Sequence, residues 1–203
     1  LKNENFDDPR IQRYIEVLEQ KSMRLKTLTE DVVEASKITS GNIKLECMKL
    51  DFTELVLQTS AEYEEKFEER NLTEIQHLPK EKALVYIDGR RTWRILANLY
   101  NNAAKYAMTG SRIYTDLKVT EGAVIFSIKN ISEQPLNINA DQLTERFIRG
   151  DISRSTEGSG LGLSIAQTLT EMQKGKFELY LDGDLFKATV TFPKVQEEQS
   201  TQI

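Results

Sequence analysis

The feature that most constrains the fold is the stretch of residues 10–40, which contains neither Gly nor Pro. Apolar side chains recur along it at helical spacings: Ile11, Tyr14, Leu18, Leu25, Leu28, Val32 and Ala35. Residues spaced three and four apart share one face of a helix, so the pattern predicts a long helix whose apolar stripe needs a partner. Lys21 is the one break in the stripe, and Gly41 is a suitable residue to end the helix.

Composition limits the class of protein and its partners. The chain has 203 residues, of which 39% are hydrophobic and 29% charged, as in an ordinary soluble protein. Its formal net charge is −5, opposite in sign to that of a protein that neutralises nucleic-acid phosphates, so we expect no nucleic-acid partner. Cys47 is the only cysteine, which rules out an internal disulfide and indicates a reducing compartment.

The N-terminus bears on localisation. The chain begins at Leu1 rather than Met, within a polar segment, and has neither a signal peptide nor a run of eighteen apolar residues. We interpret it as a fragment of a longer protein, itself soluble and cytoplasmic, whose missing part could carry a membrane anchor.

After Gly41 the apolar pattern switches between the two-residue repeat of strands and the longer repeat of helices. The expected strands are residues 43–50 (or a linker there), 72–78, 83–87, 112–119, 123–129, 177–181 and 188–192. The expected helices are residues 51–70, 88–107, 140–148 and 162–173. This order predicts an α+β fold, a mixed sheet covered by helices on one face, over residues 42–194, between a helical appendage (1–41) and a polar tail (195–203).

Asparagines cluster on the expected helix of residues 88–107. Asn98 and Asn102 are four residues apart and Lys105 follows three later, so two amides and an ammonium share one helix face. An amide oxygen suits Mg²⁺ and a nearby lysine suits phosphate. The alternative is a solvated polar face.

A glycine-rich segment, residues 157–163, leads directly into the next apolar-periodic helix. Glycines allow close approach of the backbone to a phosphate, and free N–H groups at a helix start favour anions. The spacing fits neither the dinucleotide fingerprint nor a Walker loop, and a flexible hinge is the alternative.

Just upstream, residues 145–151 read ERFIRGD. Arg149 precedes the glycine-rich segment, so it could reach a terminal phosphate once that segment closes. A surface ion pair beside a buried Phe147 explains this segment equally well.

Together the segments NLYNNAAKYA, ERFIRGD and GSGLGL resemble the asparagine, phenylalanine and glycine-rich boxes of the sensor histidine kinases, in order and approximate spacing. The resemblance is to the catalytic ATP-binding domain, of a clostridial, Gram-positive type, over residues 43–193. Residues 10–40 resemble the second helix of the dimerisation hairpin. The fold implied is the two-layer sandwich of the histidine kinase and Hsp90-type ATPases, with a mixed sheet against three helices.

The resemblance implies roles for particular residues. Asn102, with Asn98 in support, would ligate Mg²⁺, and Lys105 would contact phosphate. Arg149 would approach the terminal phosphate, so that Asn102, Lys105 and Arg149 would serve catalysis. The side chains or backbone of the following residues would contact ATP: Asn98, Asn102, Lys105, Tyr106, Asn130, Gly158, Ser159, Gly160, Leu161, Gly162 and Leu163.

The adenine-reading box departs from the family pattern. The usual Asp-x-Gly-x-Gly is replaced by residues 130–134, Asn-Ile-Ser-Glu-Gln. The Asn130 amide can still accept from the adenine amine, but if flipped it could face guanine. The hypothesis is that ATP binds with weaker adenine selectivity, and a degenerate pseudokinase is the competing interpretation.

The phosphate acceptor is the second departure. The only histidine, His77, lacks the acidic, basic and Pro residues that follow the family's phosphoacceptor, so we interpret it as an ordinary strand-end side chain. The acceptor histidine is therefore expected outside this chain.

The predicted function is the transfer of the γ-phosphate of Mg-ATP to that histidine, for relay to the receiver domain of a response regulator. The resemblance also implies a homodimer through the long helix and a location at the cytoplasmic face of the membrane in the intact protein. The alternatives are a nucleotide-gated dimerisation module without phosphotransfer, and a serine-directed anti-sigma kinase or ATPase chaperone, against which the long helix speaks.

Overall fold

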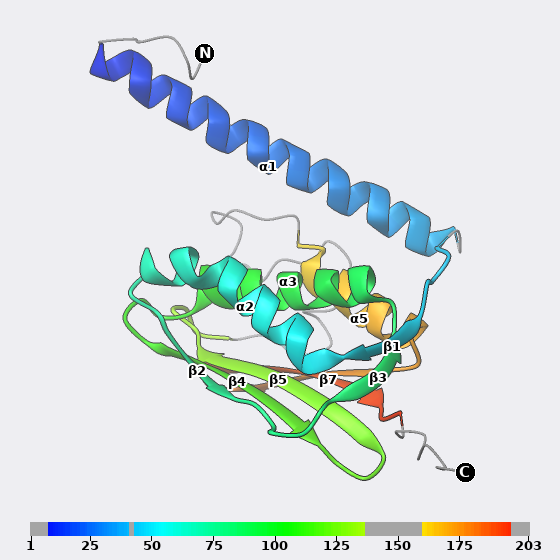
Figure 1. The fold of residues 1–203 in the computed structure, drawn as a ribbon. Coiled ribbons are helices and arrows are strands. Elements are labelled where there is room, and N and C mark those ends of the chain that lie inside the picture. Colours follow the sequence, from blue (N-terminus) through cyan, green and yellow to red (C-terminus); the bar gives the residue numbers. More distant parts are fainter. Residues whose placement is uncertain (1–7, 41–42, 137–159, 196–203) are drawn as a thin grey trace, which may run out of the picture.

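The computed structural model describes residues 8–40, 43–136 and 160–195. A layer of helices covers one face of a sheet, and a long helix lies across the outside of that layer (Figure 1). The helices are α1 (Pro9–Thr39), α2 (Phe52–Glu68), α3 (Gly89–Tyr106) and α5 (Gly162–Met172). Helices α2, α3 and α5 form the layer, which confirms the predicted sandwich of a sheet against three helices.

The sheet is mixed, as predicted. Its strands are β2 (Thr73–His77), β4 (Arg112–Val119), β5 (Ala123–Ile131), β6 (Lys176–Asp182) and β7 (Leu185–Pro193), in the order β2-β4-β5-β7-β6. Only the β2–β4 pair is parallel among these, while β4–β5, β5–β7 and β6–β7 are antiparallel. Strands β1 (Met48–Asp51) and β3 (Leu84–Ile87) pair separately, so the first expected strand is shorter than residues 43–50.

The hydrophobic core lies between the sheet and the helical layer. Along β5 the side chains of Val124, Phe126 and Ile128 are buried at every second position, as a strand with one covered face requires. The ring of Tyr100 on α3 stacks 6.5 Å from that of Phe126, which joins the helix to the sheet. This packing fixes which face of α3 remains on the outside.

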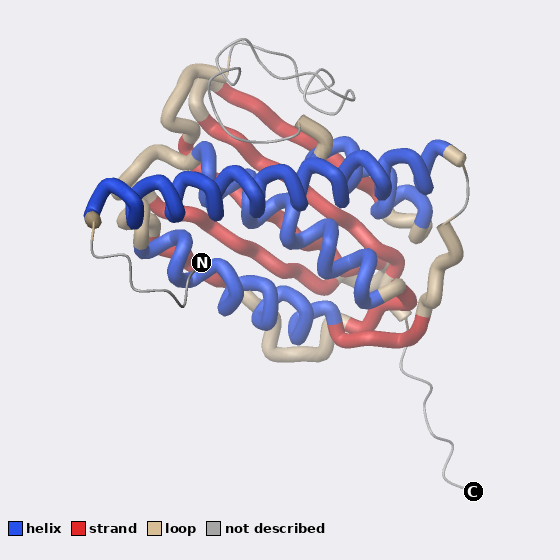
Figure 2. The backbone as a smooth tube through the Cα atoms, turned by 90° about the horizontal axis from the view of Figure 1, so that it is seen from above, coloured by secondary structure: helices blue, strands red, loops and turns tan. Residues whose placement is uncertain are grey.

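Seen from above, helix α1 crosses over the helices of the layer (Figure 2). Its contacts with the layer and the core come from its C-terminal part, at Asp31, Glu34, Ala35 and Ile38. Arg91 Nη1 of α3 lies 3.0 Å from Glu34 Oε1, and Arg94 Nε lies 3.0 Å from Glu34 Oε2. Arg94 also pairs with Asp31, whose carboxylate is buried. Four charged side chains therefore form one cluster between α1 and α3.

The predicted apolar stripe of α1 is partly covered and partly exposed to solvent. Ala35 packs against the core and Leu28 is half-buried. The other members are exposed: Ile11, Tyr14, Leu18, Leu25 and Val32. The docked residues and the apolar stripe occupy adjacent faces of α1, so most of the stripe remains exposed to solvent when the helix is docked.

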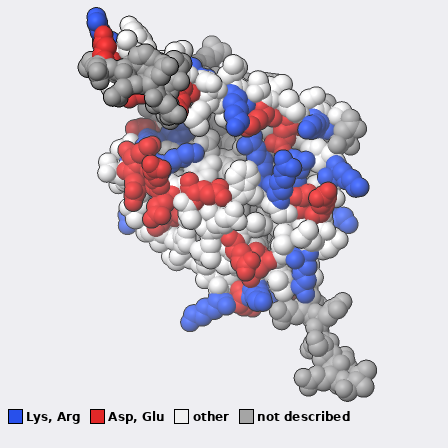
Figure 3. Space-filling model, turned by 45° about the horizontal axis from the view of Figure 1, so that its top comes forward, with Lys and Arg blue, Asp and Glu red and all other residues white. Residues whose placement is uncertain are grey.

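Charges of both signs intermingle on the face that is viewed in Figure 3. Lysines and arginines there lie beside aspartates and glutamates, and in the described part of this face they form no continuous basic surface. The expected helix of residues 140–148 and the polar tail after residue 195 lie outside the described residues. The boundaries that we predict at residues 41 and 194 remain predictions.

Candidate functional site

Helix α3 presents its asparagines on the outer side of the helical layer. The side chains of Ile95, Leu96 and Leu99 are fully buried, whereas Asn98, Asn102 and Lys105 are only half-buried. The predicted alignment of two amides and an ammonium is therefore present on the face that does not pack on the sheet.

The first of these amides lies against the start of α5. A Cβ built on Gly162 would lie 3.4 Å from Asn98 Oδ1, so the absence of a side chain at Gly162 leaves space beside that oxygen. Asn98 Nδ2 is buried and has no hydrogen-bond partner among the residues that the structure describes. Buried amide groups are nearly always paired, so this atom indicates capacity for a ligand.

The glycine-rich segment enters α5 without a capping side chain. Gly160 has a φ of +74°, which favours glycine, and Leu161 at the N-cap position offers no side-chain hydrogen bond to the helix. The first N–H groups of an α-helix have no partner within the helix. The side chains of Leu161 and Leu163 are buried in the core, so these two residues present only backbone atoms to a ligand.

Lys105 and Tyr106 form a pair at the other end of the asparagine face. Lys105 Nζ donates to the Tyr106 hydroxyl at 2.9 Å and lies 4.6 Å from the centroid of its ring. The ammonium is thus held beside the helix end, within reach of an anion bound over the asparagines.

The predicted base-reading residue, Asn130, is buried on β5 with 3% of its surface exposed. Its Nδ2 donates to the carbonyl oxygen of Ile131 at 3.2 Å, and its Oδ1 has no hydrogen-bond partner within the described ranges. The carbonyl can only accept, so this contact fixes which end of the amide is NH₂. Asn130 therefore offers a buried, unpaired acceptor.

The structure brings Asn98 and Gly162 together and places Asn102, Lys105 and Tyr106 along the same helix. Arg149, Gly158 and Ser159 lie outside the described residues. The residues present fit a magnesium nucleotide, because amide oxygens are suitable hard ligands, and because the buried Asn98 Nδ2 can donate to a phosphate oxygen and the buried Asn130 Oδ1 can accept from a base. Neither atom has a partner among the described residues. The described residues include no group of three or more His, Cys, Asp or Glu side chains placed to hold a metal.

The sequence does not reveal Arg70, at the end of α2. Its Nη1 donates to the carbonyl oxygens of Ala104 and Lys105, and its Nη2 lies 2.7 Å from Glu133 Oε2. No sequence pattern distinguishes Arg70 from any other arginine that follows a helix. Because Glu133 is 63 residues away in the sequence, only the fold shows this contact.

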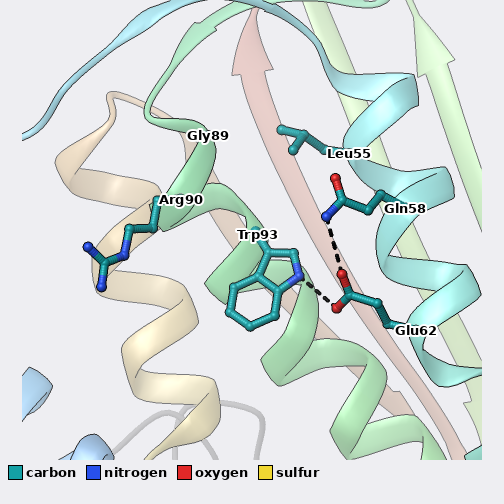
Figure 4. A pocket seen from close by; sticks show the side chains of 6 residues that line it. All are labelled: Leu55, Gln58, Glu62, Gly89, Arg90 and Trp93. Atoms are coloured by element: carbon teal, nitrogen blue, oxygen red, sulfur yellow. Dashed lines mark hydrogen bonds between the residues drawn. The ribbon is translucent and has the colours of Figure 1, made fainter.

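A separate groove of about 460 Å³ runs between α2 and α3 (Figure 4). Glu62 accepts hydrogen bonds from Gln58 and from the indole of Trp93 there. None of the predicted site residues lines this groove. We therefore separate it from the candidate nucleotide site.

No helix in the described ranges is both long and apolar enough to span a bilayer.

Comparison with known proteins places the chain among ATPases of one superfamily. A model of the family "Histidine kinase-, DNA gyrase B-, and HSP90-like ATPase" matches residues 87–199. The histidine protein kinase SaeS of Staphylococcus aureus (strain USA300) is 30% identical over 195 residues, 93% of this chain and 55% of that protein. The chain spans about half the length of the relatives that it matches.

Solved structures show the same fold. Full-length ShkA in complex with AMPPNP has a TM-score of 0.79 at 19% identity, covering 97% of this chain and 42% of that one. Histidine kinase ThkA in complex with response regulator TrrA has a TM-score of 0.67 at 23% identity, covering 94% of this chain and 53% of that one.

Proposed function

Because the chain belongs to the histidine kinase-, DNA gyrase B- and HSP90-like ATPase family and its relatives are sensor histidine kinases, we propose that it binds Mg-ATP for phosphotransfer. The γ-phosphate would pass to a histidine outside these 203 residues and then to the receiver domain of a response regulator.

One observation carries the proposal: the half-buried amide face of α3 meets the glycine start of α5 at Asn98 and Gly162. A triphosphate between them would meet backbone N–H groups from α5 and amide oxygens from α3. Mg²⁺ would be held by Asn102, with Asn98 in support, and when bound it would neutralise charge on the phosphate oxygens.

The chain's own residues would act mainly by positioning. Lys105 would hold its ammonium over the phosphates from the last turn of α3, and Arg149 would supply a second cation at the terminal phosphate. Leu161 and Leu163 would anchor the start of α5 in the core, so that its N–H groups keep their direction. Phosphoryl transfer needs little more from a protein than alignment and charge compensation.

The adenine base would be read by Asn130 through its oxygen. Turning the amide toward guanine would break the bond from Nδ2 to Ile131 O and place two oxygens against each other. We therefore propose that adenine selectivity is retained, which revises the expectation from the sequence.

The partners and location follow from the same proposal. The exposed part of the α1 stripe would pair with a hairpin helix outside these 203 residues and with a second copy to form the homodimer. The solved complex of ThkA with TrrA supports a response regulator as partner. Because ATP is a cytoplasmic substrate, the domain would lie at the cytoplasmic face of the membrane in the intact protein.

The exposed α1 stripe equally favours the alternative function, a nucleotide-gated dimerisation module without phosphotransfer. Two measurements on one preparation separate these functions. Calorimetric titration with Mg-ATP and Mg-GTP should show ATP binding, at least about tenfold tighter than GTP. Adding the acceptor hairpin of the intact protein and radiolabelled ATP should then yield acid-labile phosphohistidine.

Asn102→Ala should weaken Mg-ATP binding at least about tenfold, since it removes the proposed metal ligand. Asn101→Ala is the matched control, because Asn101 is exposed on the same helix and should change nothing. Binding without phosphohistidine would favour the dimerisation module, and no binding at all would refute both functions.

A further inference from the structure

The end of α3 and the segment after Asn130 are tied together by one arginine. Arg70 Nη1 donates to the carbonyl oxygens of Ala104 and Lys105 at 2.8 and 2.5 Å. The last carbonyl groups of an α-helix lack partners within the helix and carry its partial negative charge, so a guanidinium there is doubly favourable. The same guanidinium donates through Nη2 to Glu133 Oε2 at 2.7 Å and to Thr109 Oγ1 at 3.1 Å.

Backbone hydrogen bonds complete this junction. Met108 N donates to Ile131 O at 2.8 Å, and Glu133 N donates to Tyr106 O at 2.9 Å. On the opposite side, Ser132 N donates to Asp184 O at 2.7 Å, in the turn between β6 and β7. Residues 130–132 are thus held as extended chain between two fixed neighbours, with Ser132 at the position of the first glycine of the family pattern.

The hydrogen bonds of this junction connect to the Asn130 side chain through one atom, the carbonyl oxygen of Ile131. Ile131 O accepts both from Met108 N and from Asn130 Nδ2, so the position of the segment after α3 sets the direction of the amide. That direction leaves the buried Oδ1 as an acceptor without a partner in the described part of the chain. Any shift of α3's end relative to residues 131–133 would move this acceptor.

We infer that Arg70 and Glu133 are positioning residues for the nucleobase: they hold the end of α3 against the segment after Asn130 and so aim its amide oxygen. This inference rests on the proposed function. The clamp bonds only backbone oxygens of α3 and no side chain of Asn98, Asn102 or Lys105, so its loss should affect the base more than the phosphates. According to this inference, residues 130–134 form the base-binding site before the nucleotide binds, although they lack the two glycines of the family pattern.

The experiment uses the full chain with the variants Arg70→Met and Glu133→Gln, and Arg112→Met as control. Arg112 is an exposed arginine of β4 whose guanidinium lies over the Tyr114 ring, 5.9 Å from its centroid. Glu133→Gln keeps the shape of the side chain and the bonds from Arg70 to α3, so it tests the ion pair without loss of the fold. Two readouts are taken: hydrogen exchange and side-chain amide resonances in the absence of nucleotide, and the affinities for Mg-ATP and Mg-tripolyphosphate.

Both variants should speed exchange at the Met108 and Glu133 amides and shift the Asn130 side-chain resonances. They should weaken Mg-ATP binding about tenfold and Mg-tripolyphosphate binding clearly less, because the charge-assisted hydrogen bond to Glu133 is lost on the base side while the Lys105 side chain keeps its contact with Tyr106. For Arg70→Lys, which retains a cation, the exchange rates and the Mg-ATP affinity should lie between those of Arg70→Met and those of the unmodified chain.

Unchanged ATP affinity, or unchanged exchange, would overturn the inference. So would equal losses for ATP and tripolyphosphate, which would indicate general destabilisation. Failure of the proposed function gives a different result, because the unmodified chain itself would then not bind Mg-ATP.

Discussion

At the scale of single residues, the candidate site depends on carboxamides. Asn98, Asn102 and Asn130 supply its buried or half-buried polar groups, and a carboxamide carries no charge that could change with pH. Nucleotide affinity should therefore follow the ionisation of the phosphates rather than that of these side chains. The acid sensitivity of the fold must arise elsewhere.

One source of that sensitivity is Asp116 on β4. Burial opposes ionisation, but hydrogen bonds from Lys129 at 3.0 Å and His77 at 2.8 Å hold the pKa of this carboxyl below its ordinary 3.8. A lowered folded-state pKa stabilises the fold above about pH 4, and this contribution is lost as the pH falls through the lower value.

Asp116→Asn should accordingly lower the free energy of unfolding at pH 6 by up to about 1 kcal/mol and have little effect near pH 2. Urea unfolding of both proteins across this range measures the difference. A difference that is the same at every pH would contradict the assigned cause.

At the scale of elements, α5 and α3 meet where a glycine faces an amide. Gly162→Ala would place a methyl group about 3.4 Å from Asn98 Oδ1, an ordinary contact distance. The free energy of unfolding should stay equal or rise by up to about 1 kcal/mol, because Ala is a better helix residue than Gly. Mg-ATP affinity should fall, since the methyl group shields the amide oxygen.

Gly122→Ala is the matched control, because nothing lies within 4 Å of a Cβ built there. Calorimetry gives the affinities and thermal unfolding the stabilities. Unchanged affinity in Gly162→Ala would show that the space beside Asn98 is not part of the site.

The sequence predicted the elements and the asparagine face because both depend on local spacing. Asn98, Asn102 and Lys105 share a face in any α-helix, whatever surrounds it. The contacts of Arg70 could not be predicted, since they depend on where α2 ends relative to β5. The apolar stripe of α1 was predicted, but not that Ala35 would pack against the core of the chain's own domain while Tyr14 and Leu18 remain exposed.

At the scale of the whole molecule, charge holds α1 to the ATPase fold. Arg94→Met would remove the ion pairs that Arg94 makes with Asp31 and Glu34, and the loss of a cationic partner at the buried Asp31 carboxylate is costly. We expect α1 to undock rather than the domain to unfold, with amide exchange in residues 28–39 at least about tenfold faster.

Arg90→Met is the control for this prediction, because Arg90 is exposed one position before Arg91 on the same helix. Hydrogen exchange with mass spectrometry reads out both proteins. Unchanged exchange in residues 28–39 of Arg94→Met would show that apolar contacts alone hold the helix.

The same attachment makes α1 a lever. At about 1.5 Å per residue, the helix start at Pro9 lies about 33 Å from Asp31, so a pivot of about 10° there sweeps the far end through about 6 Å. A small rotation at the Asp31–Arg94 contact thus becomes a displacement larger than one helical turn at Pro9. A force on Pro9 acts through the same arm of about 33 Å, so it exerts a torque on α3 at Arg94, about one helical turn before Asn98.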